Sequence, residues 1–300
     1  MPEHKPSELV QQRSGAASTS ASSGAHPVLD ISVVVPVRNA ESLIEDCLDS
    51  VERSNPREII VVDGRSTDRT RERARRHGAT VLSDEGKGLP AARRIGTEAA
   101  KARWVMLLDA DVVMPDGALS ALFDEFREDG YSALQAGLHS VSGSGYWGQA
   151  LANHHRSGRS KSWFGVVATI FERDTLLRYG FDERFLSGED IELRWRLQQA
   201  GARVGVSRRT IVTHRFDDTF EFARGQWLAD GHGTGRMLRK HRWRAGLLML
   251  LPLAAGARGL MLSIGKREPR WVPYYVLFTV FNYIGIMKEL AIRRTSGARP

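Results

Sequence analysis

The sequence predicts an α/β protein in which helices flank a mostly parallel sheet, with a hydrophobic helical pair at the C-terminus. Three strand–helix units follow one another over residues 29–102, and a further apolar run at 104–108 ends in two carboxylates. Consecutive units of this kind form parallel sheets with helical crossovers. Two long apolar stretches, 245–264 and 271–287, close the chain. The 300 residues are enough for one large α/β domain and a helical appendage.

Each unit of the expected sheet has its own signal. Ile31–Val37 is a near-continuous apolar run, typical of a buried parallel strand, and apolar residues from about Ser42 have helical spacing. Glu58–Val62 is the second strand, and helix-initiating residues follow it. A short strand at 80–82, a glycine-rich turn at 86–90 and a helix at 91–102 complete the third unit. These glycines form neither a Walker motif nor a dinucleotide fingerprint, which excludes those two nucleotide-binding classes.

Composition limits the partners of the chain. A formal charge of +8 and a pI near 9.9 make phosphates and anionic membrane surfaces natural partners. The Arg-rich run at 69–76 is interpreted as a solvated helix face, and we expect no nucleic-acid binding. The single Cys47 excludes an internal disulfide and a cysteine-cluster zinc site. Residues 1–27, rich in Ser, Ala and Gly, predict a disordered tail and not a secretory signal.

The apolar run Trp104–Leu108 leads directly into Asp109 and Asp111. Residues two apart in a strand point to the same side, so both carboxylates could project from the strand's C-terminal end, where open α/β sheets bind ligands. Two hard oxygen ligands suit Mg²⁺ or Mn²⁺ shared with substrate phosphates. The alternative is a strand that simply runs into an Asp-rich turn.

Motifs in a fixed order over roughly residues 31–216 resemble glycosyltransferase family 2. They are Val34–Glu41, Val62–Asp68, Lys87–Arg93, Leu108–Asp111 and the acceptor-side signature Gly180–Phe185 with Gly188–Leu197. The resemblance implies a GT-A (Rossmann-like) fold and an inverting transferase, of hexosyltransferase type, that uses a nucleoside diphosphate sugar. It also implies Mg²⁺ or Mn²⁺ as cofactor.

The resemblance further implies roles for single residues. Asp63 would accept a hydrogen bond from the nucleotide base, and Lys87 and Arg93 would face the diphosphate as cations. Asp109 would reach the ribose or a metal-bound water, and Asp111 would hold the divalent ion. Arg94 departs from the family, whose members often carry Asn there. The implied nucleotide-sugar pocket consists of Pro36, Val37, Asn39, Glu41, Asp63, Lys87, Arg93, Asp109 and Glu189.

Asp190 is the expected catalytic base, because direct inversion needs one carboxylate to take the acceptor's hydroxyl proton. Glu189 is adjacent, but neighbouring helical residues do not face the same way, so only one of the two should meet the acceptor. The alternative is that both charges merely cap a helix N-terminus. His214, at the end of an expected strand at 204–213, is either a metal ligand or a structural residue.

Two further segments carry expectations. Residues 137–161, rich in Gly, Ser and His, are expected to form a mobile acceptor-side loop, with Trp163 as a sugar-stacking or buried aromatic residue. The segment 216–244 lacks the Gln-x-x-Arg-Trp signature of processive polysaccharide synthases. Transfer of a single sugar is therefore preferred.

The C-terminal apolar stretches are flanked and linked by basic clusters. A hairpin lying in the membrane plane or re-entering it keeps every cluster on the cytoplasmic face, although two spans are also possible. A soluble helical subdomain or a dimer interface is the alternative. The expected division is a tail at 1–27, a catalytic domain at 28–236 and a membrane-associating region at 237–300. Such an enzyme would serve a lipid-linked acceptor or a cell-surface glycan precursor.

Two other functions fit parts of this pattern. A sugar-phosphate nucleotidyltransferase uses a similar sheet and metal but normally shows an N-terminal glycine-rich basic loop, which this sequence lacks. A non-catalytic membrane-surface module could keep the fold and lose the chemistry, but the carboxylates Asp111 and Asp190 speak against it.

Overall fold

A computed structural model describes residues 28–157, 164–185 and 187–292. The expected disordered tail and Trp163 lie outside the described residues. The first half of the chain alternates strands and helices as the sequence predicts. Its elements are β1 (Leu29–Val37), α1 (Ile44–Glu52), β2 (Pro56–Asp63), α2 (Thr70–Arg76), β3 (Thr80–Ser83), α3 (Leu89–Ala99), β4 (Trp104–Leu108), β5 (Val112–Val113) and α4 (Ala118–Glu128).

The second half adds strands to the same sheet and then becomes helical. Its elements are β6 (Ala133–Ser142), α5 (Tyr146–Ser157), β7 (Ala168–Glu172), α6 (Arg173–Tyr179), α7 (Glu189–Gln199), β8 (Val204–Phe216) and α8 (Phe220–His241). The 3₁₀ helix η2 (Arg242–Leu250), α9 (Leu251–Gly265), the short η3 (Pro269–Trp271) and α10 (Val272–Ala291) follow. The expected C-terminal helical pair is confirmed as α9 and α10.

The described strands form one sheet in the order β3-β2-β1-β4-β7-β6-β8-β5. The strands β3, β2, β1 and β4 are parallel, β7 runs antiparallel between β4 and β6, and β8 is parallel to β6. The prediction of a mostly parallel sheet is confirmed. Because β1, β2 and β4 are parallel, their C-terminal ends meet at one edge of the sheet, where the predicted donor residues lie.

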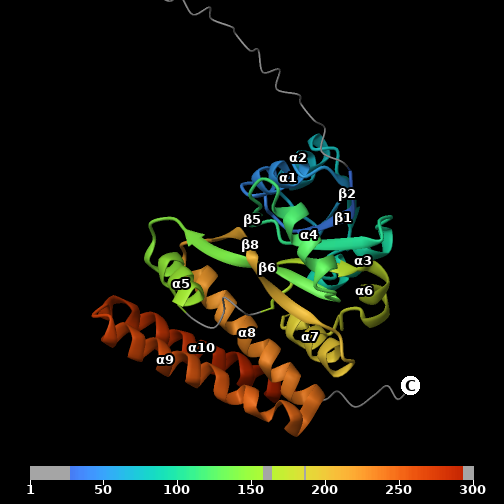
Figure 1. Cartoon of the computed structure of the whole chain (residues 1–300). Helices are drawn as coiled ribbons and strands as arrows, with labels where there is room; N and C mark the ends of the chain where they lie inside the picture. Colours follow the sequence, from blue (N-terminus) through green and yellow to red (C-terminus); the bar gives the residue numbers. More distant parts are fainter. Residues whose placement is uncertain (1–27, 158–163, 186, 293–300) are drawn as a thin grey trace, which may run out of the picture.

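Apolar side chains alternate between the two faces of the sheet and form two cores. Val33 and Val35 of β1 face the core covered by α1, α2 and α4, whereas Val34 faces the core covered by α3, α6 and α7. A third, aromatic cluster joins α5, α8 and α10 through residues such as Trp227 and Tyr274. Figure 1 shows α8, α9 and α10 gathered on the side of the molecule away from α1 and α2.

The expectation of a loop over residues 137–161 is wrong for the part of this segment that is described. Residues up to Ser142 belong to β6, and residues 146–157 form α5, which buries Leu151 in the aromatic cluster. Glycine content predicted a loop, but Gly143, Gly145 and Gly148 instead give room to Asp218, whose side chain would meet a Cβ at each of them. Close packing, and not mobility, explains these glycines.

The expected domain boundary between residues 236 and 237 falls inside α8. This helix follows the last strand of the sheet and also packs against α10. It therefore belongs to both expected regions. Among the described residues, one helical stretch, Arg244–Gly265, is long and apolar enough to cross a membrane, and 22% of its most apolar window is buried inside the protein.

Candidate active site

The first part of the candidate site lies where β1 and β2 end side by side. Val37 pairs with Asp63 in the parallel register, and Pro36 and Val37 are both buried. Asp63 is 2% exposed and accepts hydrogen bonds from the backbone N–H of Ser66. Its Oδ2 also lies 3.8 Å from Arg71 Nε. A buried carboxylate is thus held at the strand end that the sequence assigns to the nucleotide base.

Asn39 and Glu41 join the loop after β1 to the loop after β2. Asn39 has a left-handed backbone (φ 51°), and its Oδ1 accepts a hydrogen bond from the Thr67 N–H at 2.9 Å. Glu41 accepts hydrogen bonds from the backbone N–H and the guanidinium of Arg69, and these lower the pKa of Glu41. In this structure both side chains fix the shape of the expected nucleoside pocket.

Lys87 lies on the exposed turn after β3, and a carboxylate that the sequence analysis missed shapes this turn. Asp84 is buried and accepts hydrogen bonds from the backbone N–H groups of Gly86 at 2.7 Å and Gly88 at 3.0 Å. An Asp that precedes a glycine-rich turn is a known turn-forming signal, which could have identified it. Asp84 therefore fixes the turn that carries Lys87.

Arg93 of α3 joins the two halves of the site. Its guanidinium lies 3.0 Å from Asp109 Oδ1 after β4 and 2.6 Å from Glu189 Oε1 at the start of α7. The side chain is 2% exposed; burial opposes its charge, but Asp109 and Glu189 together raise the pKa of Arg93. The structure thereby brings together carboxylates 80 positions apart in the sequence. Arg93, expected to face the diphosphate, is held between them.

Asp109 and Asp111 contact different residues. Desolvation raises the pKa of Asp109 to about 6, with Asp111 adding to the rise and Arg93 opposing it. The side chains of Asp109 and Asp111 remain 26% and 28% exposed, so both reach solvent while protein surrounds them on most sides. Asp109 is engaged by Arg93, whereas Asp111 is directed toward β8.

His214 lies beside Asp111 because β5 pairs antiparallel with β8, with Val112 opposite His214. The expected strand at 204–213 runs on to Phe216, so His214 lies within β8 and not after it. Its Nε2 is 3.3 Å from Asp111 Oδ2. Burial opposes the imidazolium, but the hydrogen bond and charge of Asp111 raise the pKa of His214.

The residues around Asp111 fit a divalent cation. Asp111 Oδ1 and His214 Nδ1 are buried polar atoms without a hydrogen-bond partner among the described residues. An unpartnered buried carboxylate oxygen is costly unless a ligand satisfies it. Carboxylate oxygen is the ligand that Mg²⁺ and Mn²⁺ prefer. Asp111 is accordingly the first candidate ligand, with His214 and Asp109 at its sides.

Asp190 differs from its neighbour Glu189 in environment. Glu189 is buried on Arg93, as expected if only one of the two meets the acceptor. Asp190 is partly exposed, and desolvation, the charge of Glu189 and the charge of Asp230 raise its pKa to about 8. A carboxyl group with a pKa in this range is suited to proton transfer near neutral pH.

Asp230 of α8 is a further acidic group that the sequence analysis missed. Its side chain reaches solvent, yet desolvation by the surrounding protein raises its pKa to about 7, and its charge acts on Asp190. Its position in a helix rich in Gly and Arg gave no motif signal. The interaction with Asp190 depends on the packing of α8 against α7, which no local pattern reports.

Among curated proteins, the chain is 29% identical over 257 residues to "Succinoglycan biosynthesis protein ExoA" of Rhizobium meliloti, covering 77% of this chain and 78% of that protein. It is also 29% identical over 213 residues to "Pre-mycofactocin glycosyltransferase" of Mycobacterium tuberculosis, covering 62% of this chain and 42% of the relative. Both matches cover more than half of this chain.

Among solved structures, the fold is similar to a mannosyltransferase from Pyrobaculum calidifontis in complex with GDP-Man and Mn²⁺. The TM-score is 0.63 at 19% identity, over 90% of this chain and 91% of that one. Glucosyl-3-phosphoglycerate synthase from Mycobacterium tuberculosis, in complex with Mn²⁺, UDP-glucose and phosphoglyceric acid, matches with a TM-score of 0.53 at 21% identity, over 72% and 79% of the two chains. These likenesses show the GT-A fold.

The family model "Glycosyl transferase family 2" matches residues 32–186, which include the strand ends, Arg93 and the Asp109–Asp111 pair. The resemblance inferred from the ordered motifs is thereby confirmed. This chain belongs to glycosyl transferase family 2 and is a glycosyltransferase.

Proposed function

We propose that this chain transfers a single sugar from a nucleoside diphosphate sugar of the UDP or GDP type to a hydroxyl acceptor, with inversion at the anomeric carbon. The observation that carries the proposal is the Arg93 bridge between Asp109 and Glu189. This bridge links Asp109, after β4, to the start of α7, which bears Asp190, and so supports a single site formed by both segments. The GDP-Man and UDP-glucose complexes of the structural neighbours support this class of donor.

On the donor side, the loops after β1, β2 and β3 would bind the nucleotide. The buried Asp63 would accept a hydrogen bond from the base, in the pocket that Asn39 and Glu41 shape. The exposed Lys87 would approach the diphosphate as a cation. Asp109 would contact the ribose or an ordered water. In this arrangement the diphosphate would lie over the C-terminal end of β4, next to Asp111.

Mg²⁺ or Mn²⁺ would be held by Asp111, with His214 and Asp109 beside it. Such an ion neutralises charge on the leaving diphosphate when bound. Neighbouring structures contain Mn²⁺ or Mg²⁺ together with nucleotide, which supports the choice of metal. His214 lies beside Asp111 and would offer a ring nitrogen as a further ligand in its neutral form.

Asp190 would act as the base. As the acceptor oxygen attacks the anomeric carbon, its proton passes to the Asp190 carboxylate, and the bond to the diphosphate breaks on the opposite face of the sugar. The pKa of about 8 makes this carboxylate a stronger base than an ordinary aspartate. Glu189, buried on Arg93, would keep the start of α7 in register with the donor site.

We further propose that the C-terminal helices attach the enzyme to the cytoplasmic face of the membrane. Large apolar side chains of η2 and α9 are exposed, among them Leu247 at 79% and Ile264 at 71%. Lys266 and Arg267 follow directly and would meet anionic headgroups. Such attachment fits a lipid-linked acceptor or a precursor of a cell-surface glycan. The similarity to a succinoglycan biosynthesis protein supports an acceptor of this kind.

A donor screen tests the proposal first. With Mn²⁺ present, the correct nucleoside diphosphate sugar should raise the melting temperature by mass action, and turnover should release a nucleoside diphosphate. Release of pyrophosphate would identify a nucleotidyltransferase instead. The absence of stabilisation by any donor, with no turnover, would favour the non-catalytic module.

Asp190→Asn then tests the base. The variant should lose transfer by roughly a thousandfold while keeping donor affinity, because the carboxylate acts only on the acceptor proton. Asp174→Asn, at an exposed position of α6, is the matched control and should transfer at the parent rate. Loss of donor binding in Asp190→Asn, or retained transfer, would contradict the assignment.

A further inference from the structure

At Gly233, the helix α8 contacts the segment that carries the proposed base backbone to backbone. A Cβ on Gly233 would lie 2.9 Å from the Ser187 carbonyl oxygen and 3.0 Å from Gly188 Cα. Gly188 is the N-cap of α7 and has a left-handed backbone (φ 76°), so this turn also needs glycine. Asp190 is the second residue of α7. Any displacement of Gly188 therefore moves the base.

The opposite side of α8 is packed as closely against α10. A Cβ on Gly231 would meet the Asn282 carbonyl oxygen, and one on Gly235 would lie 2.8 Å from Glu289 Cβ. Residues 231 and 235 share one helix face, and residue 233 lies about 200° around the axis from residue 231. Alternate glycines thus hold α8 directly between α10 and the start of α7.

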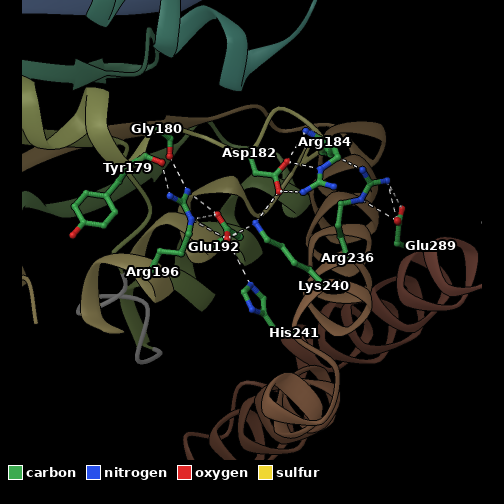
Figure 2. A network of polar contacts seen from close by, with 10 residues as sticks. All are labelled: Tyr179, Gly180, Asp182, Arg184, Glu192, Arg196, Arg236, Lys240, His241 and Glu289. Carbon is green, nitrogen blue, oxygen red and sulfur yellow. Dashed lines mark hydrogen bonds and ion pairs between the residues drawn. The ribbon is translucent and has the colours of Figure 1, made fainter. Parts of the chain in front are cut away.

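Ion pairs fix the same three elements along the next turns, as Figure 2 shows. Lys240 Nζ lies 2.6 Å from Glu192 Oε1 of α7 and 2.7 Å from Asp182 Oδ2 in the loop before it. Glu192 is fully buried and is also bound by Arg196, whose guanidinium donates a hydrogen bond to the Gly180 carbonyl at 2.7 Å. These contacts, which we call the clamp, join both segments of the acceptor-side signature, 180–185 and 188–197, to each other and to α8.

The anchor of this clamp is Glu289 of α10. Its carboxylate is buried and accepts a hydrogen bond from Arg236 at 2.9 Å (Figure 2). It accepts a second hydrogen bond from Arg239 at 3.0 Å. Arg236 also donates a hydrogen bond to the Arg184 carbonyl oxygen. Burial opposes the charge of Glu289, but the two arginines lower its pKa, so the carboxylate stays ionised. The chain of contacts runs from α10 through α8 to the loop and helix around Asp190.

We infer that α8 is a positioning element for catalysis: the helix is held against α10, and its residues Gly233 and Lys240 set the place of the Asp190 carboxylate relative to the donor. This inference rests on the proposed function, in which Asp190 is the base. Gly233 and Lys240 are positioning residues, because they touch α7 and its preceding loop and not the reacting atoms. A misplacement of about 1 Å at a catalytic group can lower a rate by about a hundredfold. A methyl group inserted at Gly233 is expected to cause a shift of this order.

A pair of alanine substitutions in the same helix tests the inference. Gly233→Ala should lower kcat at least tenfold, with the dissociation constants of UDP–Mn²⁺ and GDP–Mn²⁺ within twofold of the parent. Gly225→Ala is the matched control, because nothing lies within 4 Å of its added Cβ and alanine favours a helix. Amide hydrogen exchange at residues 187–192 should be faster in Gly233→Ala than in Gly225→Ala, and this measurement needs no substrate.

Lys240 provides a second series if Gly233→Ala does not fold. Lys240→Met keeps the length of the side chain but removes the charge, and should lower kcat without weakening nucleotide binding. Lys240→Arg should restore part of kcat, because it can again pair with Asp182 and Glu192. Lys101→Met, an exposed position before β4, is the control and should behave as the parent does.

The outcomes separate this inference from the function on which it rests. Transfer that survives Asp190→Asn overturns the proposed base, whereas the exchange measurements still report on the clamp. Loss of transfer in Asp190→Asn, with parental kcat and exchange in both Gly233→Ala and Lys240→Met, overturns the inference alone. A fall of nucleotide affinity in parallel with kcat also overturns it, because the effect would then not be confined to the acceptor side.

Discussion

The two halves of the candidate site are held in different ways. On the donor side, residues 29–113, hydrogen bonds within the loops at the strand ends fix the geometry, such as those from the N–H groups of Gly86 and Gly88 to Asp84. On the acceptor side, residues 173–292, ion pairs between helices fix the geometry, as in the pairs Lys240–Glu192 and Arg236–Glu289. The donor side is therefore built by the sheet, the loops at its strand ends and α3, whereas the acceptor side needs the C-terminal helices.

The largest effect should come from the metal position on the donor side. Asp111→Asn removes a charged oxygen ligand, and we expect transfer to fall by about a thousandfold, since Lewis-acid assistance contributes several kcal/mol. Titration of transfer with Mn²⁺ measures the loss. Asp116→Asn, at an exposed position after β5, is the control. An unchanged response to Mn²⁺ in Asp111→Asn would place the metal elsewhere.

A large stability effect should come from the acceptor side. Glu192→Gln breaks a buried group of ion pairs and leaves Lys240 and Arg196 less well paired, so we expect a loss of about 3 kcal/mol in the free energy of unfolding. Denaturant unfolding measures it. Glu98→Gln removes an exposed pair with Arg94 on the donor side and should cost less than about 1 kcal/mol. An equal loss of unfolding free energy in Glu192→Gln and Glu98→Gln would contradict this difference between the two halves.

A smaller effect, in the pH profile, should come from Asp230. A base with a pKa of about 8 is deprotonated as pH rises, so kcat/KM should increase through this range. Asp230→Asn removes a negative charge that raises this pKa, and the profile should move to lower pH by up to about one unit. Glu221→Gln, in the first turn of the same helix, should leave the profile in place. Identical pH profiles of kcat/KM for Asp230→Asn and Glu221→Gln would contradict an effect of Asp230 on the pKa of Asp190.

The smallest effect should be on membrane attachment. Ile264→Gln replaces one of several exposed apolar side chains on α9, and binding to vesicles with anionic lipids should weaken about fivefold, or about 1 kcal/mol. Ile211→Gln, exposed on β8, is the control and should bind as the parent does. Absence of vesicle binding by the parent chain would contradict membrane attachment altogether.

The position of the donor-half residues at the sheet edge could be predicted from the sequence because the signals are local. An apolar strand followed by a polar turn, as at Asp63 or Asp109, places a side chain at the sheet edge whatever follows. The acceptor half could not be predicted to the same depth. The bridge from Arg93 to Glu189 and the charge of Asp230 on Asp190 join elements far apart in the sequence, and periodicity does not report such contacts. The prediction of a loop over residues 137–161 was wrong because close packing, as at Gly143, Gly145 and Gly148, favours glycine just as loop formation does.

The packing of α8 on α10 has a practical consequence for anyone preparing this enzyme. Shortening the chain before α10 to improve solubility would remove Glu289 and leave Arg236 and Arg239 without this buried partner. It would also strip the cover from Gly231 and Gly235, in a helix that glycine already weakens. A destabilised fragment without transfer activity is the expected product. An active preparation is therefore expected to need α10.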